Sequence, residues 1–542
     1  MKHQTNFRIS AAFVRGLAIA CVTVVLGLCL TVATPVAAQS AQITLLHISD
    51  THSHLAAWGP KDAALDGTLG GLPKAAAIVT AEKALDPQAL FVHAGDFMEG
   101  DFFFKDYFGV PELQLLKSLG LDALALGNHD FVFGPDFLAG VFQSAWPGGG
   151  VPVLGTNLSV PGGSQLAPWV IPTMIREVHG VKVGFCGLTV KGAARTKRDY
   201  VTILPYLDPS VPAAVAALRA AGAQVVICVT HLGMVAARDL AGKVPGIDVI
   251  VNGHDNAVLE QPEQVGTTLI VSAGNHYRWV GRLRLAVDGS NVSLVDYALL
   301  SADANTPSLP AVQAAIDALK AEIVARHGDV YHQPIAWADV DLTLNWDPDH
   351  AKRDTPLGNL FADAYRAWTG TDIAIEPFGY LGDAIPAGPI VGADVFRAMS
   401  YVELVPGEPT ARFWRLVTFP TTGAALLGTL ETTLAVGGDY FPQVSGLRLD
   451  YDSSAASGHK ILLDTVHVNG HKLVEDQLYS VTVTEGVCAV LSAQLGVCKQ
   501  DVQTLSAFAF DAARLLVALR GELGLATSNR IRDVAAIPGK GR

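Results

Sequence analysis

The stretch Ile43-Thr-Leu-Leu-His-Ile-Ser-Asp-Thr-His-Ser-His-Leu55 begins as an apolar run and changes abruptly to polar residues at Asp50 and His52. A short, continuous run of aliphatic and β-branched residues is typical of a strand that is buried on both faces. We therefore expect a buried strand whose carboxyl end presents Asp50 and His52.

The same pattern occurs at four further places along the chain. At each one an apolar run ends in polar residues: Leu90–His93 before Gly95-Asp96, Ala123–Leu126 before Gly127-Asn128-His129-Asp130, Val225–Val229 before Thr230-His231, and Val249–Val251 before Gly253-His254-Asp255-Asn256. In open α/β sheets, ligands bind beyond the carboxyl ends of the strands, so side chains that are distant in sequence meet there. The sequence predicts one site built from five strand ends.

The residue types at these strand ends are those of a two-metal hydrolytic centre. A carboxylate such as Asp96 can bridge two divalent ions about 3.5–4 Å apart, and the hydroxide held between them is then the nucleophile. The other candidate ligands are imidazoles and oxygen donors, without thiolate: His52, His231, His254, Asp50 and Asn128. This mixture of nitrogen and oxygen favours Zn, Mn, Fe or Co over Mg or Ca.

His129 follows Asn128 directly, so its side chain is expected to point elsewhere and to face the leaving group. Asp130 is a candidate for fixing its orientation, as carboxylates next to metal sites commonly do for histidine. Each of these fragments alone also has a purely structural explanation, such as a turn or a helix cap. The hydrolytic interpretation depends on all five occurring in order, each at the end of an apolar run.

Composition restricts the class of protein. With 542 residues, half of them hydrophobic and 16% charged, the chain suits two or three well-packed domains. The net charge is −13, and it becomes −16 without the first 38 residues, which hold three basic residues and no acidic one. This balance argues against a nucleic acid polymer as partner. Small anionic substrates are still compatible, because bound metal ions reverse the local charge.

The first 38 residues have the features of an export signal. Three basic residues precede or flank the uncharged apolar stretch 16–33, and Val36-Ala37-Ala38 offers the small residues of a cleavage site. The alternative is an uncleaved anchor, because the apolar stretch approaches membrane-spanning length. We expect cleavage, no stable membrane anchor afterwards, and a periplasmic or secreted protein. In an oxidising compartment Cys488 and Cys498 are expected to pair, with Cys186 and Cys228 as buried thiols.

Strands and helices alternate from Ile43 to about Ser301, which predicts a layered α/β domain. A segment rich in Ser, Asn and Pro follows, and then an amphipathic helix at 311–326. The expected division is a signal peptide at 1–38, a catalytic domain at 39–305, a linker helix within 306–330, a second mixed α/β domain at 331–533, and a tail at 534–542.

The motifs Asp50-Thr-His52, Gly95-Asp96, Gly127-Asn128-His129-Asp130, Thr230-His231 and Gly253-His254 resemble those of the calcineurin-like metallophosphoesterases. The two-domain layout resembles the periplasmic 5′-nucleotidase branch, which includes UDP-sugar hydrolases and 2′,3′-cyclic-nucleotide 2′-phosphodiesterases. The resemblance implies an αββα catalytic domain, a C-terminal substrate-binding domain and a role in nucleotide catabolism. It implies one metal held by Asp50, His52, Asp96 and Asn256, and another by Asp96, Asn128, His231 and His254. It also implies His129 and Asp130 as the catalytic pair.

The chain departs from the family pattern at two places. Asn256 stands where a histidine is frequent, with Asp255 and His276 as fallback ligands. In the second domain, the phosphate-binding loop corresponds to 376–383 and lacks its arginine, and the base-stacking segment corresponds to 484–491 and lacks its aromatic residue. Candidates for contacting substrate are Phe378, Tyr380, Tyr401, Trp414 and Phe441.

The sequence therefore predicts an exported two-metal phosphoesterase that hydrolyses nucleotides or related small phosphate esters by metal-hydroxide attack. Two alternatives stay open: the same hydrolytic core acting on a non-nucleotide ester, and an exported binding protein with a vestigial site. The complete set of ligands argues against the binding protein.

Overall fold

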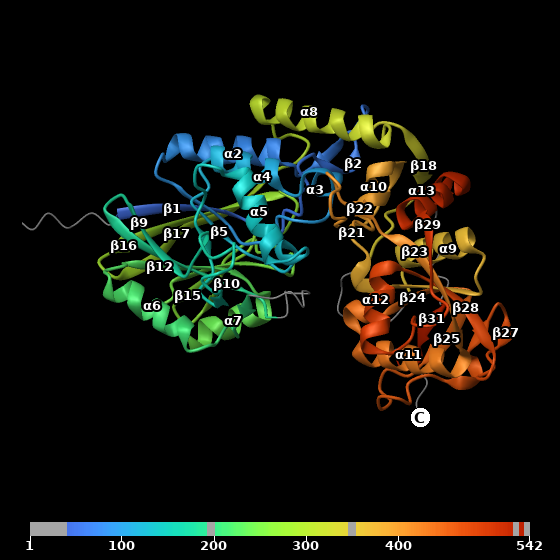
Figure 1. Cartoon of the computed structure of the whole chain (residues 1–542). Coiled ribbons are helices and arrows are strands. Elements are labelled where there is room, and N and C mark those ends of the chain that lie inside the picture. The colour runs from blue at the N-terminus through green and yellow to red at the C-terminus, as the bar shows by residue number, and fades with distance from the viewer. Residues whose placement is uncertain (1–40, 192–200, 345–353, 524–529, 536–542) are drawn as a thin grey trace, which may run out of the picture.

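The computed structural model describes residues 41–191, 201–344, 354–523 and 530–535. The expected signal peptide and most of the expected tail lie outside these residues. Figure 1 shows two α/β domains, with helix α8 (Pro310–His327) lying along the first and leading into the second. None of the helices within the described residues is both long and apolar enough to cross a bilayer.

The N-terminal domain contains two sheets. The first has the order β17-β16-β1-β4-β5-β6-β8, and the second has the order β14-β15-β13-β12-β10-β9. The strands of the first are β1 (Ala41–Ile48), β4 (Leu90–His93), β5 (Ala123–Ala125), β6 (Val153–Leu154), β8 (Val170–Ile171), β16 (Trp279–Asp288) and β17 (Asn291–Ser301). Those of the second are β9 (Thr173–Val178), β10 (Val181–Thr189), β12 (Val225–His231), β13 (Val249–Gly253), β14 (Glu263–Val265) and β15 (Thr268–Val271).

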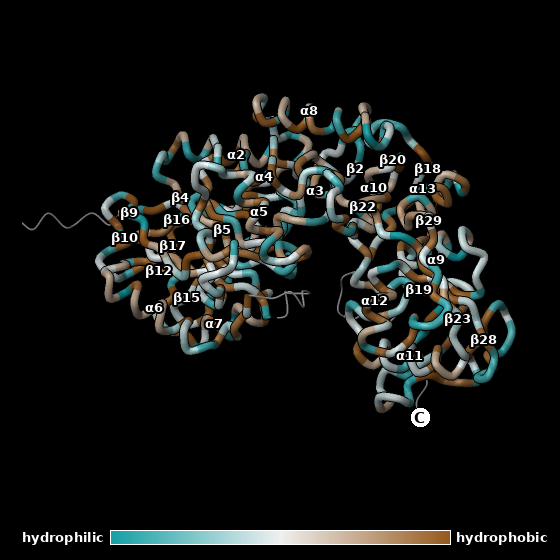
Figure 2. Tube along the Cα trace, viewed as in Figure 1, coloured by the Kyte–Doolittle hydropathy of each residue, from teal (hydrophilic) through white to brown (hydrophobic). Residues whose placement is uncertain are grey.

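The two sheets pack face to face between two layers of helices. Strand β1 is apolar because it is buried on both faces. Leu45 packs in the core between the sheets, and its neighbour Leu46 packs in the core under the helices. Helices α2 (Leu72–Leu85), α4 (Val110–Ser118) and α5 (Pro135–Ala145) belong to one outer layer, and α6 (Ser210–Ala220) and α7 (Met234–Lys243) to the other. The expected αββα architecture is confirmed. Figure 2 shows hydrophobic stretches running through the strands of both domains.

Parallel pairing brings the polar residues to one edge. Strand β1 pairs parallel with β4, so that Ile48 lies opposite His93, and β12 pairs parallel with β13, so that His231 lies opposite Gly253. Because the strands run in the same direction, the residues that follow them leave at the same edge of each sheet.

The C-terminal domain is built on a five-stranded sheet of order β24-β19-β28-β23-β29. Its strands are β19 (Ile373–Pro377), β23 (Arg415–Thr422), β24 (Pro442–Ser445), β28 (Leu478–Thr484) and β29 (Gln503–Phe508), and its main helices are α9 (Pro356–Thr369), α11 (Gly423–Val436), α12 (Glu485–Gln494) and α13 (Ala509–Arg520). Thr355 caps the start of helix α9, because its hydroxyl oxygen accepts a hydrogen bond from the backbone N–H of Gly358.

The two domains share a buried boundary formed by α3 (Phe102–Tyr107) and α10 (Gly392–Arg397). The rings of Phe102 and Phe396 lie 4.4 Å apart across it. Arg397 Nε donates to Asp101 Oδ2 at 2.6 Å, and both side chains are almost fully buried. Apolar packing and buried charge together hold the second domain against the loop that contains Asp96.

The cysteine prediction is confirmed. Cys488 and Cys498 form a disulfide with their Cα atoms 5.6 Å apart, whereas Cys186 and Cys228 are buried free thiols. The disulfide joins α12 to the segment that follows it.

Candidate metal centre

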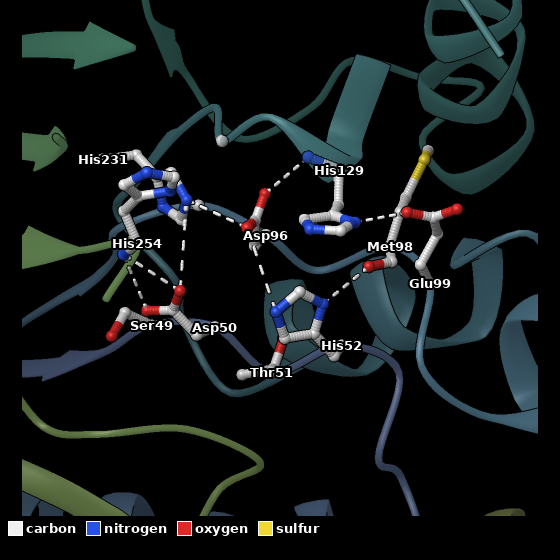
Figure 3. Close-up of polar contacts among 12 residues, drawn as sticks. Ser49, Asp50, Thr51, His52, Asp96, Met98, Glu99, His129, His231 and His254 are labelled. Carbon is white, nitrogen blue, oxygen red and sulfur yellow. Dashed lines mark hydrogen bonds and ion pairs between the residues drawn. The ribbon is translucent and has the colours of Figure 1, made fainter. Parts of the chain in front are cut away.

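Five strand ends converge on one cluster of ligand atoms, drawn in Figure 3. Ligand atoms of Asp50, His52 and Asp96 lie within 4.8 Å of one another, and so do those of Asp96, His231 and His254. Asp96 is common to both groups. His231 Nε2 lies 2.9 Å from Asp96 Oδ2, and His52 Nε2 lies 3.9 Å from the same oxygen.

Hydrogen bonds on the far side of two histidine rings direct a lone pair into the cluster. His52 Nδ1 lies 3.1 Å from the carbonyl oxygen of Met98, and His231 Nδ1 lies 2.8 Å from that of Ala94. A carbonyl oxygen only accepts, so Nδ1 carries the hydrogen in both rings. In the neutral imidazole Nε2 then has a lone pair, and both Nε2 atoms face the Asp96 carboxylate.

The backbone of the cluster is strained. Left-handed φ angles occur at Asp50 (50°), His52 (47°), Asp96 (57°) and His254 (96°), a conformation that side chains other than glycine rarely adopt. Such residues collect at functional sites, where the surrounding fold holds them in place. Gly127 permits the close approach of its neighbours, since a Cβ there would lie 2.1 Å from Asp96 Oδ1.

Buried charge also distinguishes the cluster. Burial raises the pKa of Asp50 to about 7, against the opposing effect of His231. Burial also disfavours the charged form of Asp96, but His231 and the other nearby histidines outweigh it and hold the pKa of that carboxyl well below its usual range. The pKa of His231 rises to about 10 because the two carboxylates outweigh its burial. The histidines thus keep Asp96 charged, whereas a bound cation would be needed to keep Asp50 fully charged as well.

The unpaired atoms of the cluster fit divalent ions. His231 Nε2 faces the Asp96 carboxylate, and within the described part of the chain the buried Oδ1 of Asn128 has no hydrogen-bond partner. Buried polar atoms without a partner are costly, and metal coordination satisfies them. Two carboxylates, three imidazoles and an amide oxygen match the ligand types of Zn, Mn, Fe or Co.

His129 lies beside the cluster, but its partner is not the expected one. His129 and Asp130 lie in a single 3₁₀ turn (His129–Phe131), where adjacent side chains point about 120° apart. The Asp130 carboxylate accepts the backbone N–H groups of Gly127, Asp96, Phe97 and Met98. Asp130 therefore stabilises the Asp96 loop, and Nδ1 of His129 is bonded instead to Glu99 Oε2.

Sequence reasoning missed Glu99. It lies three residues after Asp96, its side chain is 5% exposed, and its backbone is left-handed (φ 65°). Figure 3 shows Glu99 on one side of the His129 ring, with the other ring nitrogen pointing towards Asp96. A buried acid shortly after a metal-ligating aspartate is too common in sequences to single this residue out.

The comparisons with known proteins agree with this architecture. The family model of the calcineurin-like phosphoesterases matches residues 43–257, and that of the 5′-nucleotidase C-terminal domain matches residues 335–489. Together they span more than half of the chain. The chain belongs to the 5′-nucleotidase family of calcineurin-like phosphoesterases. Proteins of this family use divalent metals.

This member of the 5′-nucleotidase family is similar to proteins of known structure or sequence, and the share of the chain that matches differs among them. The crystal structure of a 5′-nucleotidase precursor from Thermus thermophilus superimposes with a TM-score of 0.77 at 25% identity, covering 92% of this chain and 100% of that one. The trifunctional nucleotide phosphoesterase protein YfkN of Bacillus subtilis is 26% identical over 82% of this chain and 32% of its own length. A snake venom 5′-nucleotidase of Gloydius brevicauda is 30% identical over 44% of this chain and 41% of its own. The chain thus spans less than half the length of these two curated relatives.

The remaining ligand candidates of this family member differ in their surroundings. Asn256 lies in an exposed turn after β13 with a left-handed backbone (φ 54°). Asp255 Oδ2 accepts the N–H of Met234 at the start of α7, which is a structural role. His276 is buried, and its backbone N–H donates to the carbonyl oxygen of Asp50.

A second histidine group connects the metallophosphoesterase domain to the 5′-nucleotidase C-terminal domain, and sequence reasoning did not identify it. His54 Nε2 lies 2.6 Å from Oδ2 of Asp383, and the rings of His54 and His276 stack 3.7 Å apart at 13°. Lone pairs of stacked rings run parallel and do not converge on one ion. The geometry therefore favours a histidine–aspartate contact between the domains over a third metal site.

The five aromatic candidates in the 5′-nucleotidase C-terminal domain do not behave alike. Phe378 and Phe441 are buried in the core (3% and 1% exposed). Tyr380, Tyr401 and Trp414 form a half-buried cluster with ring centres 5.1–5.5 Å apart. Only Tyr380 among the five lines the cavity found in this domain within the described residues.

Proposed function

We propose that this protein is an exported, metal-dependent phosphoesterase that hydrolyses small phosphate esters. The observation that carries the proposal is the double use of Asp96, whose carboxylate belongs to both groups of ligand atoms. A shared carboxylate between two sets of nitrogen and oxygen donors is the arrangement that a two-metal centre requires. Family membership supports the same reaction class.

The proposed ligands are Asp50, His52, Asp96 and Asn256 for one ion, and Asp96, Asn128, His231 and His254 for the other. When bound, such ions activate a water molecule for attack on phosphorus and neutralise the phosphate oxygens. The ring contacts of His52 and His231 with backbone carbonyls support this role, because they fix which nitrogen faces the ion.

His129 is the proposed proton donor to the leaving group. Glu99 accepts from its Nδ1–H and so stabilises the protonated ring, which leaves the other ring nitrogen to deliver a proton. The role of Glu99 is positioning, since it acts through His129. The pair replaces the expected pair of His129 and Asp130.

Export after cleavage at residue 38 is part of the proposal. The Cys488–Cys498 disulfide supports it, because disulfides persist in oxidising compartments. The N-terminal sequence and mass of the protein recovered from the periplasm or medium test the cleavage. A mature chain that starts at Met1 would contradict it.

The central test is a substrate screen with purified mature protein, using nucleotides, cyclic nucleotides, nucleotide sugars and simple aryl and alkyl phosphates. Metal is counted in parallel by mass spectrometry. We expect about two divalent ions per chain, and phosphate release that stops on chelation and returns on adding metal. Activity that survives exhaustive chelation, or a single tightly bound ion, is incompatible with the proposal.

A further inference from the structure

Glu112 is a buried acid that contacts a ligand loop of the proposed metal centre without being one of the ligands. It lies in the first turn of α4, and none of its surface is exposed. Its Oε1 accepts two short hydrogen bonds, from the hydroxyl of Thr51 at 2.6 Å and from that of Tyr277 at 2.5 Å. Burial raises the pKa of Glu112 to about 7, against these hydrogen bonds. A carboxyl group is costly to bury, so its place here depends on what its oxygen holds.

The hydrogen bonds continue from Glu112 through Thr51 to His93. Nδ1 of His93 accepts the backbone N–H of Gly95 at 3.0 Å, so the ring is neutral and Nε2 carries its hydrogen. Nε2 then donates to the hydroxyl oxygen of Thr51 at 2.9 Å, and this hydroxyl donates to Glu112. All three side chains are fully buried. One directed chain of hydrogen bonds therefore joins the end of β4, the loop after β1 and helix α4.

Thr51 stands between Asp50 and His52, two proposed ligands of one ion. The backbone is left-handed at both ligands (φ 50° and 47°), a conformation that costs free energy and persists only where the surroundings enforce it. The hydroxyl of Thr51 lies in the middle of this strained loop, and Glu112 accepts its hydrogen. The loop thus has a buried anchor at the residue that separates the two ligands.

Asp130 offers a comparison, because it is also a buried acid outside the ligand set. Its carboxylate accepts the backbone N–H groups of residues 96–98 and so supports the next ligand loop. The hydrogen bonds that the described residues make to Glu112 and Thr51 reach neither His231 nor His254. The support that Glu112 gives is therefore directed to one of the two groups of ligands.

We propose that Glu112 is a positioning residue of the metal centre. It acts through the hydroxyl of Thr51 and holds the strained loop so that Asp50 and His52 face one ion. The inference rests on the two-metal centre of the proposed function. Without this hydrogen bond the loop can relax and its two ligands turn away from the ion. Removing a group that orients metal ligands typically changes metal affinity by about 10–100-fold.

The test measures the affinity of the metal-free protein for Zn²⁺ alone, by competition with a chromogenic chelator. Thr51→Val keeps the shape of the side chain and removes the hydroxyl. We expect it to raise the Kd of one ion by about 10–100-fold and that of the other by less than about threefold. Thr51→Ser restores the hydroxyl and should return both constants to within about threefold of the wild type.

The matched control is Thr268→Val, in β15 of the same domain. Thr268 is also buried, and its hydroxyl donates to the carbonyl oxygen of Ile247 at 2.7 Å, outside the hydrogen-bond chain of Glu112. This variant should lower the melting temperature of the metal-free protein and leave both Zn²⁺ constants unchanged. The same result for Thr51→Val would show a merely structural role and overturn the inference. An equal rise in both constants would also overturn it.

A second pair of variants carries the test if Thr51→Val does not fold. Glu112→Leu removes the acceptor oxygen and should weaken the same ion by about 10–100-fold. Glu112→Gln keeps an amide oxygen where Oε1 lies and should bind both ions nearly as the wild type does. Equal Zn²⁺ constants for Glu112→Leu and Glu112→Gln would overturn the inference.

Because the titration uses no substrate, it separates the inference from the proposed function. If the wild type cleaves no phosphate ester but Thr51→Val selectively loses one Zn²⁺, the phosphoesterase proposal fails and the positioning role of Glu112 stands. If phosphate esters are cleaved but Thr51→Val binds both ions as the wild type does, the inference fails alone. A wild type that binds no Zn²⁺ would overturn both.

Discussion

Asp96 is the residue on which the proposed metal centre depends most. Its carboxylate contacts His231, His52 and the backbone N–H of His129. We expect Asp96→Asn to reduce bound metal from about two ions to one or none and to abolish phosphate release, since it removes the shared ligand. Metal analysis together with an aryl phosphate assay checks this.

Asp255→Asn is the matched control, because Asp255 lies next to His254 but caps α7. It should retain both ions. Asn256→Ala tests whether Asn256 is a metal ligand. If metal content and rate are unchanged, Asn256 is not one of the ligands.

The pair of His129 and Glu99 makes a second prediction at this scale. His129→Ala should keep both metals and lower kcat by about 10²–10⁴, the usual range for a lost general acid. Glu99→Gln should give a smaller loss in kcat with little change in KM. If Glu99 acts through His129, the double variant should be no slower than His129→Ala alone. Additive losses would show that Glu99 has a separate role.

The convergence of the candidate ligands could be predicted from the sequence better than the contacts that orient them. Asp50, His52, Asp96, His231 and His254 stand at the ends of apolar runs, and strand pairing alone brings such positions together. Two local features decide the partner of His129. A 3₁₀ turn directs Asp130 inward, and the left-handed backbone of Glu99 directs its side chain towards the His129 ring. Neither feature has a periodic signature in the sequence.

Among the elements, strand β19 carries an unusual residue. Glu376 is 2% exposed, and burial raises the pKa of its carboxyl well above the usual value. The folded protein therefore retains a proton that the unfolded chain releases, so this residue contributes less stability as pH rises above about 4.3. Glu376→Gln should raise Tm by about 2–4 °C at pH 8 and change it little at pH 4. An equal effect at both pH values would indicate a packing change.

Helices and buried strands were predictable to within a few residues. Helix α8 (Pro310–His327) was expected at 311–326, and β4 (Leu90–His93) covers the apolar run recognised at the same residues. These elements have strong local patterns. Strand β12 continues to His231, two residues beyond its apolar run, because pairing with β10 and β13 extends to that point.

For the whole molecule, the buried contact of Arg397 with Asp101 is the clearest test of how the domains hold together. Arg397→Leu should lower the free energy of unfolding by about 3–5 kcal/mol, because it leaves the Asp101 carboxylate buried without its partner. Adding Asp101→Asn should restore part of the loss. Urea unfolding measures both, and a loss below about 1 kcal/mol would mean that water reaches Asp101.

The contacts between the domains could not be predicted from the sequence. Asp101 and Arg397, like His54 and Asp383, are about 300 residues apart and belong to different local patterns. Only the tertiary arrangement gives these residues their partners.

The disulfide of α12 has a consequence for how the protein must be produced. It joins α12 to the segment that follows it in the C-terminal domain, whereas the proposed metal ligands lie in the other domain. Recombinant material made in a reducing cytosol would thus combine an intact metal site with a less stable C-terminal domain. Its metal content would look normal, while its C-terminal domain would unfold at a lower temperature than that of the oxidised protein. Metal content alone would then be a misleading measure of whether the protein had matured.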